Sequence, residues 1–262
     1  DIGAINNFLK MFFPAGFYYK TFMWPPSFWY KIYEPFIRMA AGFGEASIKH
    51  DKERYEHKYE YCDLLVTGSG PSGLASAYAA AKNGARVILA EDKPRYGGSL
   101  LTSDVNIGNQ TGVEWSEKII AELKSMSNVT VKNRSQVFGY YDHNMLVMSE
   151  RISDHLPKTQ KYLPKQRLWY IRANEVLISS GSIERPLVFG NNDTPGVMLS
   201  SAAKEYMKVY GVLVGKKSLI FTNNDSGYET AIEFKKNGVN PLILDTRKEP
   251  SSDIINEAKN LN

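Results

Sequence analysis

Cysteine is almost absent from this sequence, because Cys62 is the only one among its 262 residues. A single cysteine excludes an intramolecular disulfide and the C-x-x-C pair of a dithiol redox site, and it fits the reducing cytosol. We therefore expect a cytoplasmic protein in which Cys62 is a small buried residue. Long apolar runs are missing too, and no uninterrupted stretch is long enough to span a bilayer. We expect no membrane partner.

The sequence also lacks the motifs of hydrolytic and metal-dependent enzymes. It contains neither a G-x-S-x-G nor an H-E-x-x-H pattern. The four histidines, His50, His57, His143 and His155, lie in polar stretches, so we assign no catalytic residue and no metal site. The net charge of +4 comes from scattered basic residues rather than from a basic patch, which argues against a nucleic-acid partner.

A glycine-rich turn is the most informative feature that the sequence does contain. The run CDLLVTGSGPSG, residues 62–73, joins a short apolar strand to an alanine-rich helix. Gly68, Gly70 and Gly73 have the G-x-G-x-x-G spacing. In such a turn the first glycine permits a tight bend, the second lets a pyrophosphate approach the backbone, and the third lets the helix pack closely on the strand. The helix N-terminus then offers free N–H groups to the phosphates. The predicted site includes the residues between the glycines, Ser69, Pro71 and Ser72.

The glycine spacing alone is weak evidence, and the residues that follow it strengthen the prediction. Residues 85–90 form a second apolar strand that ends at Glu91, eighteen residues after Gly73, near the spacing of an acid that binds a ribose hydroxyl. Such an acid favours NAD over NADP, because it would repel a 2′-phosphate. The pair Gly97-Gly98 is typical of flavoproteins, so FAD stays open beside NAD. The predicted site extends to Asp92, Gly98 and Ser99.

Downstream, the pattern predicts an amphipathic helix over residues 113–125 and strands over 129–131 and 137–148, the latter broken by a turn at 142–144. Such a meander often follows the first strands of flavoproteins that bind two dinucleotides. A further strand, residues 175–179, leads into Ser180-Gly181. These two small residues would allow close passage of a cofactor, although a plain turn explains them equally well.

Residues 217–245 have the rhythm of a second strand–helix–strand unit, but the glycine turn is degenerate. Asn223 and Asp225 stand where the first two glycines belong, and only Gly227 is kept. Side chains there would crowd a pyrophosphate, and Asp225 would repel it. We therefore interpret this unit as architectural, with nucleotide binding as the weaker alternative, and Asp245 at its end as a solvated acid.

The N-terminal region is unusually aromatic, with twelve aromatic residues between positions 11 and 37. Prolines and charges exclude a membrane segment, and two lysines are too few for a nucleic-acid stacking platform. We expect an arm whose rings anchor it against another domain or subunit. The predicted organisation is an aromatic arm (1–48), a charged connector (49–60), a dinucleotide-binding Rossmann-type domain with a β-meander (61–200) and a degenerate second Rossmann-like unit (201–262). The fold class is thus α/β, a Rossmann-type two-dinucleotide-binding fold of the FAD/NAD(P)-binding, pyridine nucleotide-disulfide oxidoreductase-like kind.

Several stretches closely resemble the alpha subunits of heterotetrameric sarcosine oxidases. They are PAGFYYKTFMWP in the arm, GSGPSGLASAYAAAKNGARVILAED at the glycine turn, SGSIERPLVFGNNDTPGVM after the third apolar strand, and FTNNDSGYETA in the second unit. The likeness runs from about residue 5 to residue 245. Those subunits carry further domains on both sides of this region, and the chain begins at Asp1, so the resemblance implies a piece of a longer protein. Ser179-Ser180-Gly181 stands where related enzymes usually have Ala-Thr-Gly, a small change in side-chain size at the turn that would contact the cofactor.

The resemblance implies a function in a complex with beta, gamma and delta subunits. Such a complex oxidises sarcosine to glycine, with formaldehyde or methylene-tetrahydrofolate and hydrogen peroxide as further products, and it holds FMN and FAD. The flavin chemistry belongs to the beta subunit, including its border with alpha. The alpha site would hold NAD that does not turn over, with the Gly68–Gly73 turn on the pyrophosphate, Glu91 on the ribose, and Ser180-Gly181 near the far half.

Two other functions are weighed against this one. The first is a self-contained reductase of the thioredoxin-reductase type that uses FAD and NAD(P)H. It would need a second working glycine turn and a redox-active pair, and the sequence has neither. The second is an assembly module that holds partner subunits through the aromatic arm around a purely structural nucleotide.

Overall fold

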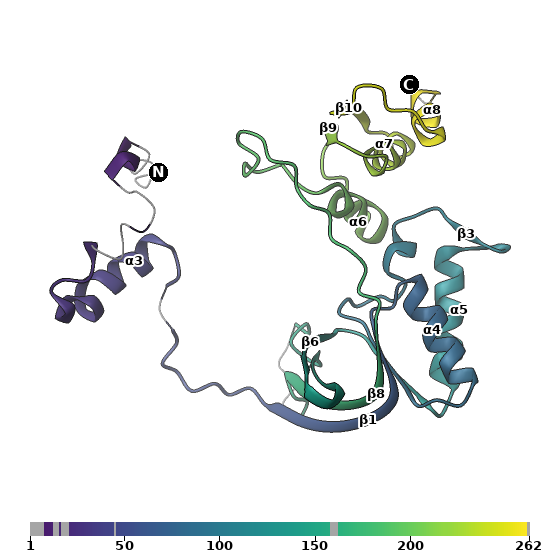
Figure 1. Ribbon diagram of the computed structural model, residues 1–262, viewed down its shortest axis with the longest axis horizontal. Coiled ribbons are helices and arrows are strands. Elements are labelled where there is room, and N and C mark those ends of the chain that lie inside the picture. Colours follow the sequence, from purple (N-terminus) through teal and green to yellow (C-terminus); the bar gives the residue numbers. More distant parts are fainter. Residues whose placement is uncertain (1–7, 13–15, 17–20, 45, 158–161, 261–262) are drawn as a thin grey trace. The chain divides into compact units, whose positions relative to one another are not determined.

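The structure is a computed structural model that describes residues 8–12, 16, 21–44, 46–157 and 162–260. The chain divides into two compact units, Asp1–Lys52 and Glu53–Asn262 (Figure 1). No helix in the described part of the chain is long and apolar enough to cross a membrane.

The described residues of the first unit include several short helical turns with exposed apolar side chains. It contains η2 (Lys10–Phe12), η3 (Pro26–Phe28), the single π-helical turn η4 (Trp29–Tyr33) and α3 (Glu34–Ala40), and none of these elements buries a residue. Trp24 is 80% exposed. Local contacts hold the turns together: Tyr33 packs its ring against Phe22 and Phe28, and its hydroxyl donates to the carbonyl of Trp24 over 3.0 Å.

The second unit is built on a six-stranded mixed sheet in the order β5-β2-β1-β8-β7-β6. Its parallel strands are β5 (Val129–Lys132), β2 (Val87–Ala90), β1 (Tyr55–Thr67) and β8 (Gln166–Ile178). An antiparallel meander adds β7 (Met145–Arg151) and β6 (Ser135–Tyr141), joined by the turn η6 (Asp142–Asn144). The predicted meander and its turn are confirmed.

Two helices cross over between the parallel strands and cover one face of the sheet (Figure 1). They are α4 (Pro71–Lys82) and α5 (Gly112–Ser125), and the latter begins with a capping box between Thr111 and Glu114. Leu74 of α4 and Leu123 of α5 are fully buried in one cluster with the apolar residues of β1 and β2. The sheet curves strongly, and on its other side Leu146 and Met148 of β7 share a second cluster with the central strands.

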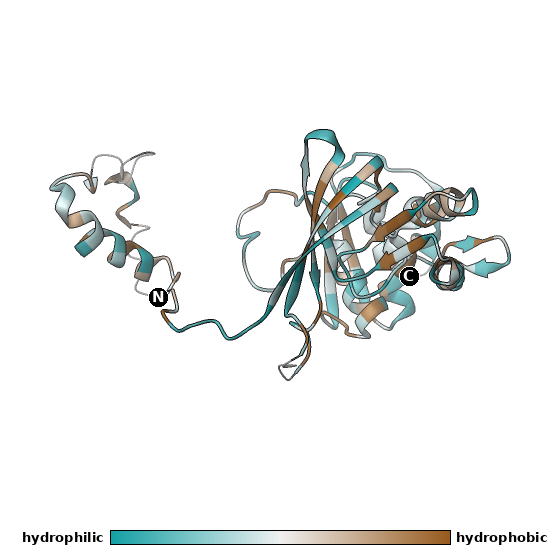
Figure 2. Ribbon diagram, turned by 90° about the horizontal axis from the view of Figure 1, so that it is seen from below, coloured by the Kyte–Doolittle hydropathy of each residue, from teal (hydrophilic) through white to brown (hydrophobic). Residues whose placement is uncertain are grey.

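The first half of β1 corrects the sequence-based placement of residues 49–60 in a connector. Residues 55–60 are paired with β8 along their whole length. Residues 55–60 are hydrophilic (Figure 2), so they lack the apolar residues by which a strand is usually recognised in a sequence. Aromatic and charged side chains alternate along them instead. Tyr59 stacks on Tyr170 at 5.1 Å between ring centroids, and Glu56 pairs with Arg167 at 2.9 Å. Cross-strand pairs therefore hold this part of β1 where a buried core does not.

The predicted second strand–helix–strand unit is present. It consists of β9 (Lys217–Thr222), α7 (Ser226–Lys236) and β10 (Asn240–Asp245), with β9 and β10 paired in parallel, and α8 (Asp253–Asn260) follows. Small elements lie between the larger ones: η5 (Gly98–Leu101) and the short hairpin of β3 (Asn106–Ile107) and β4 (Gln110–Thr111).

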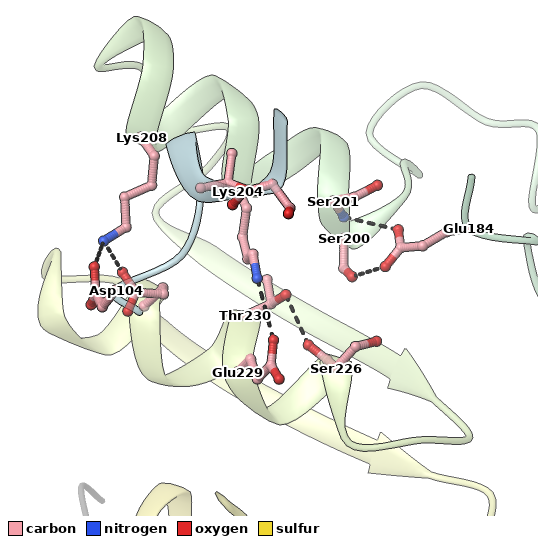
Figure 3. A network of polar contacts seen from close by, with 12 residues as sticks. Asp104, Glu184, Ser200, Ser201, Lys204, Lys208, Ser226, Glu229 and Thr230 are labelled. Carbon is pink, nitrogen blue, oxygen red and sulfur yellow. Dashed lines mark hydrogen bonds and ion pairs between the residues drawn. The ribbon is translucent and has the colours of Figure 1, made fainter. Parts of the chain in front are cut away.

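Helix α6 (Ser200–Tyr210) lies in the chain between the last strand of the six-stranded sheet, β8, and the second strand–helix–strand unit. The sequence pattern did not predict this helix. Figure 3 shows its lysines reaching acidic residues on both sides. Lys208 lies 2.7 Å from Asp104, after η5, and 2.5 Å from Glu233 of α7. The carboxylate of Glu184 accepts hydrogen bonds from Ser200 Oγ and Ser201 N, at 2.6 and 2.8 Å, and so caps the helix from outside its own sequence.

Candidate functional site

Gly68 and Gly73 bring the start of α4 against the ends of β1 and β8. Gly68 has a φ of +98°, and a Cβ there would lie 2.4 Å from the carbonyl oxygen of Ser179. A Cβ on Gly73 would lie 2.0 Å from the carbonyl oxygen of Gly68 and 2.6 Å from Oγ of Ser179. Neither position accepts a side chain without a backbone movement. This close packing is the role that the spacing predicts for the first and third glycines.

Gly70 faces open space instead. A Cβ on this residue would meet no heavy atom within 4 Å. Gly70 directly precedes α4, whose first residue is Pro71, and proline suits this position because it needs no N–H partner there. The backbone N–H groups of Gly70, Ser72 and Gly73 have no hydrogen-bond acceptor among the described residues. Three donors without an acceptor thus lie at a helix N-terminus beside the open space at Gly70, an arrangement that suits an anion.

Glu91 follows directly after β2, but its carboxylate already has partners in the protein. It is only 6% exposed, and Oε2 accepts hydrogen bonds from Ser69 N at 2.9 Å and from Ser69 Oγ at 2.6 Å. Oε1 accepts from Lys93 N at 3.0 Å. Burial raises the pKa of Glu91, and the hydrogen bonds from Ser69 and Lys93 oppose that shift only partly. Glu91 therefore ties the glycine turn to β2, a role that the sequence did not predict. A ribose hydroxyl would have to share Oε1 with Lys93.

The loop of Gly97 and Gly98 lies against the glycine turn. Gly97 N donates to the carbonyl oxygen of Ser69 over 3.1 Å. A Cβ on Gly98 would lie 2.8 Å from Cα of Gly70, so a larger residue would press on the turn. The pair therefore closes one side of the approach to Gly70, and the exposed Ser99 continues that side at the start of η5.

The end of β8 closes another side, through a residue that the sequence analysis did not include in the site. Ser179 N donates to the carbonyl oxygen of Thr67, and its Oγ lies 2.9 Å from that oxygen and 3.0 Å from the carbonyl oxygen of Gly68. Its one hydroxyl proton can serve either acceptor at a time. The sequence signal that could have placed Ser179 in the site is its position directly before Ser180-Gly181. Ser180 and Gly181 follow at the same edge, and Gly181 has a φ of +73° with open space around it.

The structure thus brings all the predicted site residues to one edge of the sheet, at the carboxyl ends of β1, β2 and β8. Ser69 is fully buried, whereas Pro71, Ser72, Asp92 and Ser180 lie at the exposed rim. The backbone carbonyl of Asp92 accepts a hydrogen bond from Arg151 at 2.8 Å. Ligands of open α/β sheets bind at this edge, so the residues fit the pyrophosphate and ribose of a dinucleotide.

The second strand–helix–strand unit repeats the packing of this turn. A Cβ on Gly227 would lie 2.7 Å from Cβ and from Oγ1 of Thr222. Gly227 therefore approaches the end of β9 as Gly73 approaches Gly68 at the end of β1. By this packing Gly227 takes the third glycine position, and Thr222 takes the first.

The strand register gives the same correspondence. The last pair of β1 and β2 is Thr67 with Ala90, so the same register continued by one residue places Gly68 beside Glu91. In the second unit the corresponding register position is the pair of Thr222 with Asp245. The second glycine position then falls on Asn224. The sequence-based placement of Asn223 and Asp225 at the first two glycine positions was wrong by one residue, because the G-x-G-x-x-G spacing counted back from Gly227 falls on Thr222 and Asn224.

These features define the class of protein: an α/β domain with the FAD/NAD(P)-binding fold of oxidoreductases. The family model described as "FAD dependent oxidoreductase" matches residues 63–152. The fold is similar to that of L-proline dehydrogenase from P. horikoshii, with a TM-score of 0.60, 21% identity, and coverage of 80% of this chain and 40% of that one. It is also similar to T. acidophilum thioredoxin reductase, with a TM-score of 0.54, 16% identity, and coverage of 77% and 62%.

Relatives in sequence identify a more specific group within this class of oxidoreductase folds. The chain is 46% identical to the sarcosine oxidase alpha subunit of Rhizobium meliloti (strain 1021) over 99% of this chain and 26% of that protein. It is 36% identical to the same subunit from Corynebacterium sp. (strain P-1), over 79% and 22%. The homologue from Corynebacterium sp. (strain U-96) is 35% identical over 82% and 22%. The chain is a homologue of the sarcosine oxidase alpha subunits over almost its whole length, which confirms the resemblance. It spans about a quarter of the length of those curated relatives.

Proposed function

We propose that this chain is the dinucleotide-binding part of an alpha subunit of the sarcosine oxidase type, and that its glycine turn holds NAD. The observation that carries the proposal is the set of three unpaired N–H groups, on Gly70, Ser72 and Gly73, beside the open space at Gly70. A pyrophosphate carries the charge and the acceptors that such donors lack.

The residues around the turn would divide the work of binding. Gly70 and the first turn of α4 would hold the pyrophosphate, and Glu91 and Asp92 would face the adenosine ribose. Ser180 and Gly181 would lie along the far half of the cofactor. Bound NAD supplies a nicotinamide ring that can carry a hydride. We assign no proton-transfer role to this chain's own residues and propose that the nucleotide is structural.

FAD is the second candidate for the same site. The Gly97-Gly98 loop favours it, because this glycine pair is typical of flavoproteins and here lies within contact distance of Gly70. The match to a FAD dependent oxidoreductase model favours it too. NAD is favoured by the likeness to the sarcosine oxidase alpha subunits.

The parent complex would oxidise sarcosine to glycine in the cytoplasm, with formaldehyde or methylene-tetrahydrofolate and hydrogen peroxide as further products. Its flavin chemistry would lie with the beta subunit, including its border with alpha, and the gamma and delta subunits would be further partners. The arm is proposed as a contact with such a partner, because Trp24, Tyr30 and Phe36 are largely exposed and its helical turns bury no residue of their own.

The test is to release whatever the purified protein holds with acid and to identify it by mass and absorbance. NAD without flavin is the expected result. FAD would transfer the assignment to the second candidate and favour a flavoprotein reductase. If no nucleotide is retained, titration with NAD and FAD follows, and a failure to bind either would refute the proposed site.

A further inference from the structure

The second strand–helix–strand unit has the same turn geometry as the first, but its donors are occupied. In the correspondence set by packing and register, Asn224 N stands for Gly70 N and Ser226 N for Ser72 N. Asn224 N donates to Oγ1 of Thr222 over 3.2 Å. Ser226 N donates to Oδ1 of Asn224 over 3.0 Å. Two of the three N–H groups that are free in the first turn are therefore satisfied within the second.

The side chain of Asn224 also fills the approach that Gly70 leaves open. Its Oδ1 accepts a second hydrogen bond, from Oγ of Ser226 at 2.6 Å, and its Nδ2 donates to Oδ1 of Asn223 at 3.0 Å. An amide oxygen thus lies at the helix N-terminus where a phosphate oxygen would lie in a working turn.

The strand-end acid of this unit is occupied as well. Asp245 accepts hydrogen bonds from Arg247 through N at 2.9 Å, Nε at 3.1 Å and Nη2 at 2.8 Å, and from the hydroxyl of Tyr228 at 3.1 Å. Its side chain is 8% exposed. Arg247 Nη1 pairs with Asp225 of the turn at 2.8 Å. One guanidinium therefore binds both the strand-end acid and the turn, and both carboxylate oxygens of Asp245 have partners within the unit.

We propose that the second unit is closed to nucleotides by its own side chains: Asn224 takes the place of the phosphate, and Arg247 takes the place of the ribose. The chain then holds one dinucleotide, in the first turn. A reductase that passes a hydride between two dinucleotides in neighbouring Rossmann units needs both turns open, so this chain is not one. The inference holds whichever nucleotide the first turn binds.

The first test blocks nucleotide binding at the first turn and measures whether the second unit still binds a nucleotide. NAD and FAD are titrated separately against the whole chain and against its Gly70→Val variant. We expect about one equivalent bound by the wild type and no saturable binding below about 1 mM by the variant. Saturable binding that persists in Gly70→Val and disappears in Gly70→Val/Asn224→Arg would overturn the closure. If the wild type binds neither nucleotide, the first-turn assignment fails and the closure of the second unit stands.

The second test concerns Arg247. We expect Arg247→Ala to lower the unfolding midpoint relative to Lys248→Ala, a matched loss of one positive charge on an exposed neighbour. The difference should shrink at about 1 M salt, where the screening length falls to about 3 Å. Affinity for the nucleotide of the first turn should stay unchanged. Equal midpoints for the two variants, or a tenfold weaker nucleotide affinity of Arg247→Ala alone, would contradict the role given to this residue.

Discussion

Replacing Gly73 with alanine should destabilise the protein, although alanine is the better helix former. The added Cβ would lie 2.0 Å from the carbonyl oxygen of Gly68, which is backbone and is held by the bond from Gly68 N to Ala90 O at 2.8 Å. Overpacking of this kind costs roughly 1–3 kcal/mol, and a backbone clash belongs at the upper end of that range. The helix gains about 1 kcal/mol from the glycine-to-alanine change. The net loss is about 2 kcal/mol, or a fall of roughly 4–8 °C in the unfolding midpoint.

Gly70→Ala is the matched control, because the same chemical change there meets open space. Gly70 has a φ of −66°, which any residue adopts, so its midpoint without nucleotide should stay within about 2 °C of the wild type. Nucleotide affinity should fall in Gly70→Ala, since the methyl group points into the approach of the phosphates. Both variants are compared by thermal unfolding with and without NAD. A Gly73→Ala protein as stable as the wild type, or a Gly70→Ala protein that is clearly less stable, would refute the packing argument.

Three further predictions concern other parts of the compact unit Glu53–Asn262. Burial raises the pKa of Cys62 to about 12, so the native protein should resist thiol reagents at pH 8 and react only when unfolded; rapid native labelling would contradict this. Glu184→Ala removes the cap of α6 and should cost about 1 kcal/mol in denaturant unfolding, whereas the exposed Glu249→Ala should cost almost nothing. The hydrogen bond from Lys208 lowers the pKa of Asp104 from 3.8 to about 2, so its stabilisation is present above pH 4 and is lost as the pH falls towards 2; a constant difference between the wild type and Asp104→Asn across that range would be inconsistent.

The first glycine turn could be predicted from the sequence because its geometry is set locally. Three glycines at fixed spacing, an apolar strand before them and an alanine-rich helix after them require one arrangement, and the structure has it at Gly68, Gly70 and Gly73. The helix of residues 113–125 and the turn at 142–144 were predictable for the same reason. Each carries its own periodicity or its own turn residues.

Features that depend on distant partners could not be predicted. Helix α6 has no side-chain cap at its own N-cap residue, Leu199, and its cap comes from Glu184, sixteen residues before Ser200. Glu91 stands at the spacing of a ribose ligand, but the spacing does not show that Ser69 would occupy its carboxylate. The hydrogen bonds of Asp245 with Arg247 and Tyr228 were likewise not visible in the spacing of the second unit.

The most direct test of the central claim is an experimental structure of the purified protein with NAD added at saturating concentration. The account predicts both phosphates at the N-terminus of α4, within hydrogen-bond distance of the N–H groups of Gly70, Ser72 and Gly73, with no nucleotide at Asn224. A pyrophosphate bound at the N-terminus of α7 instead, or an empty first turn under saturating nucleotide, would contradict it.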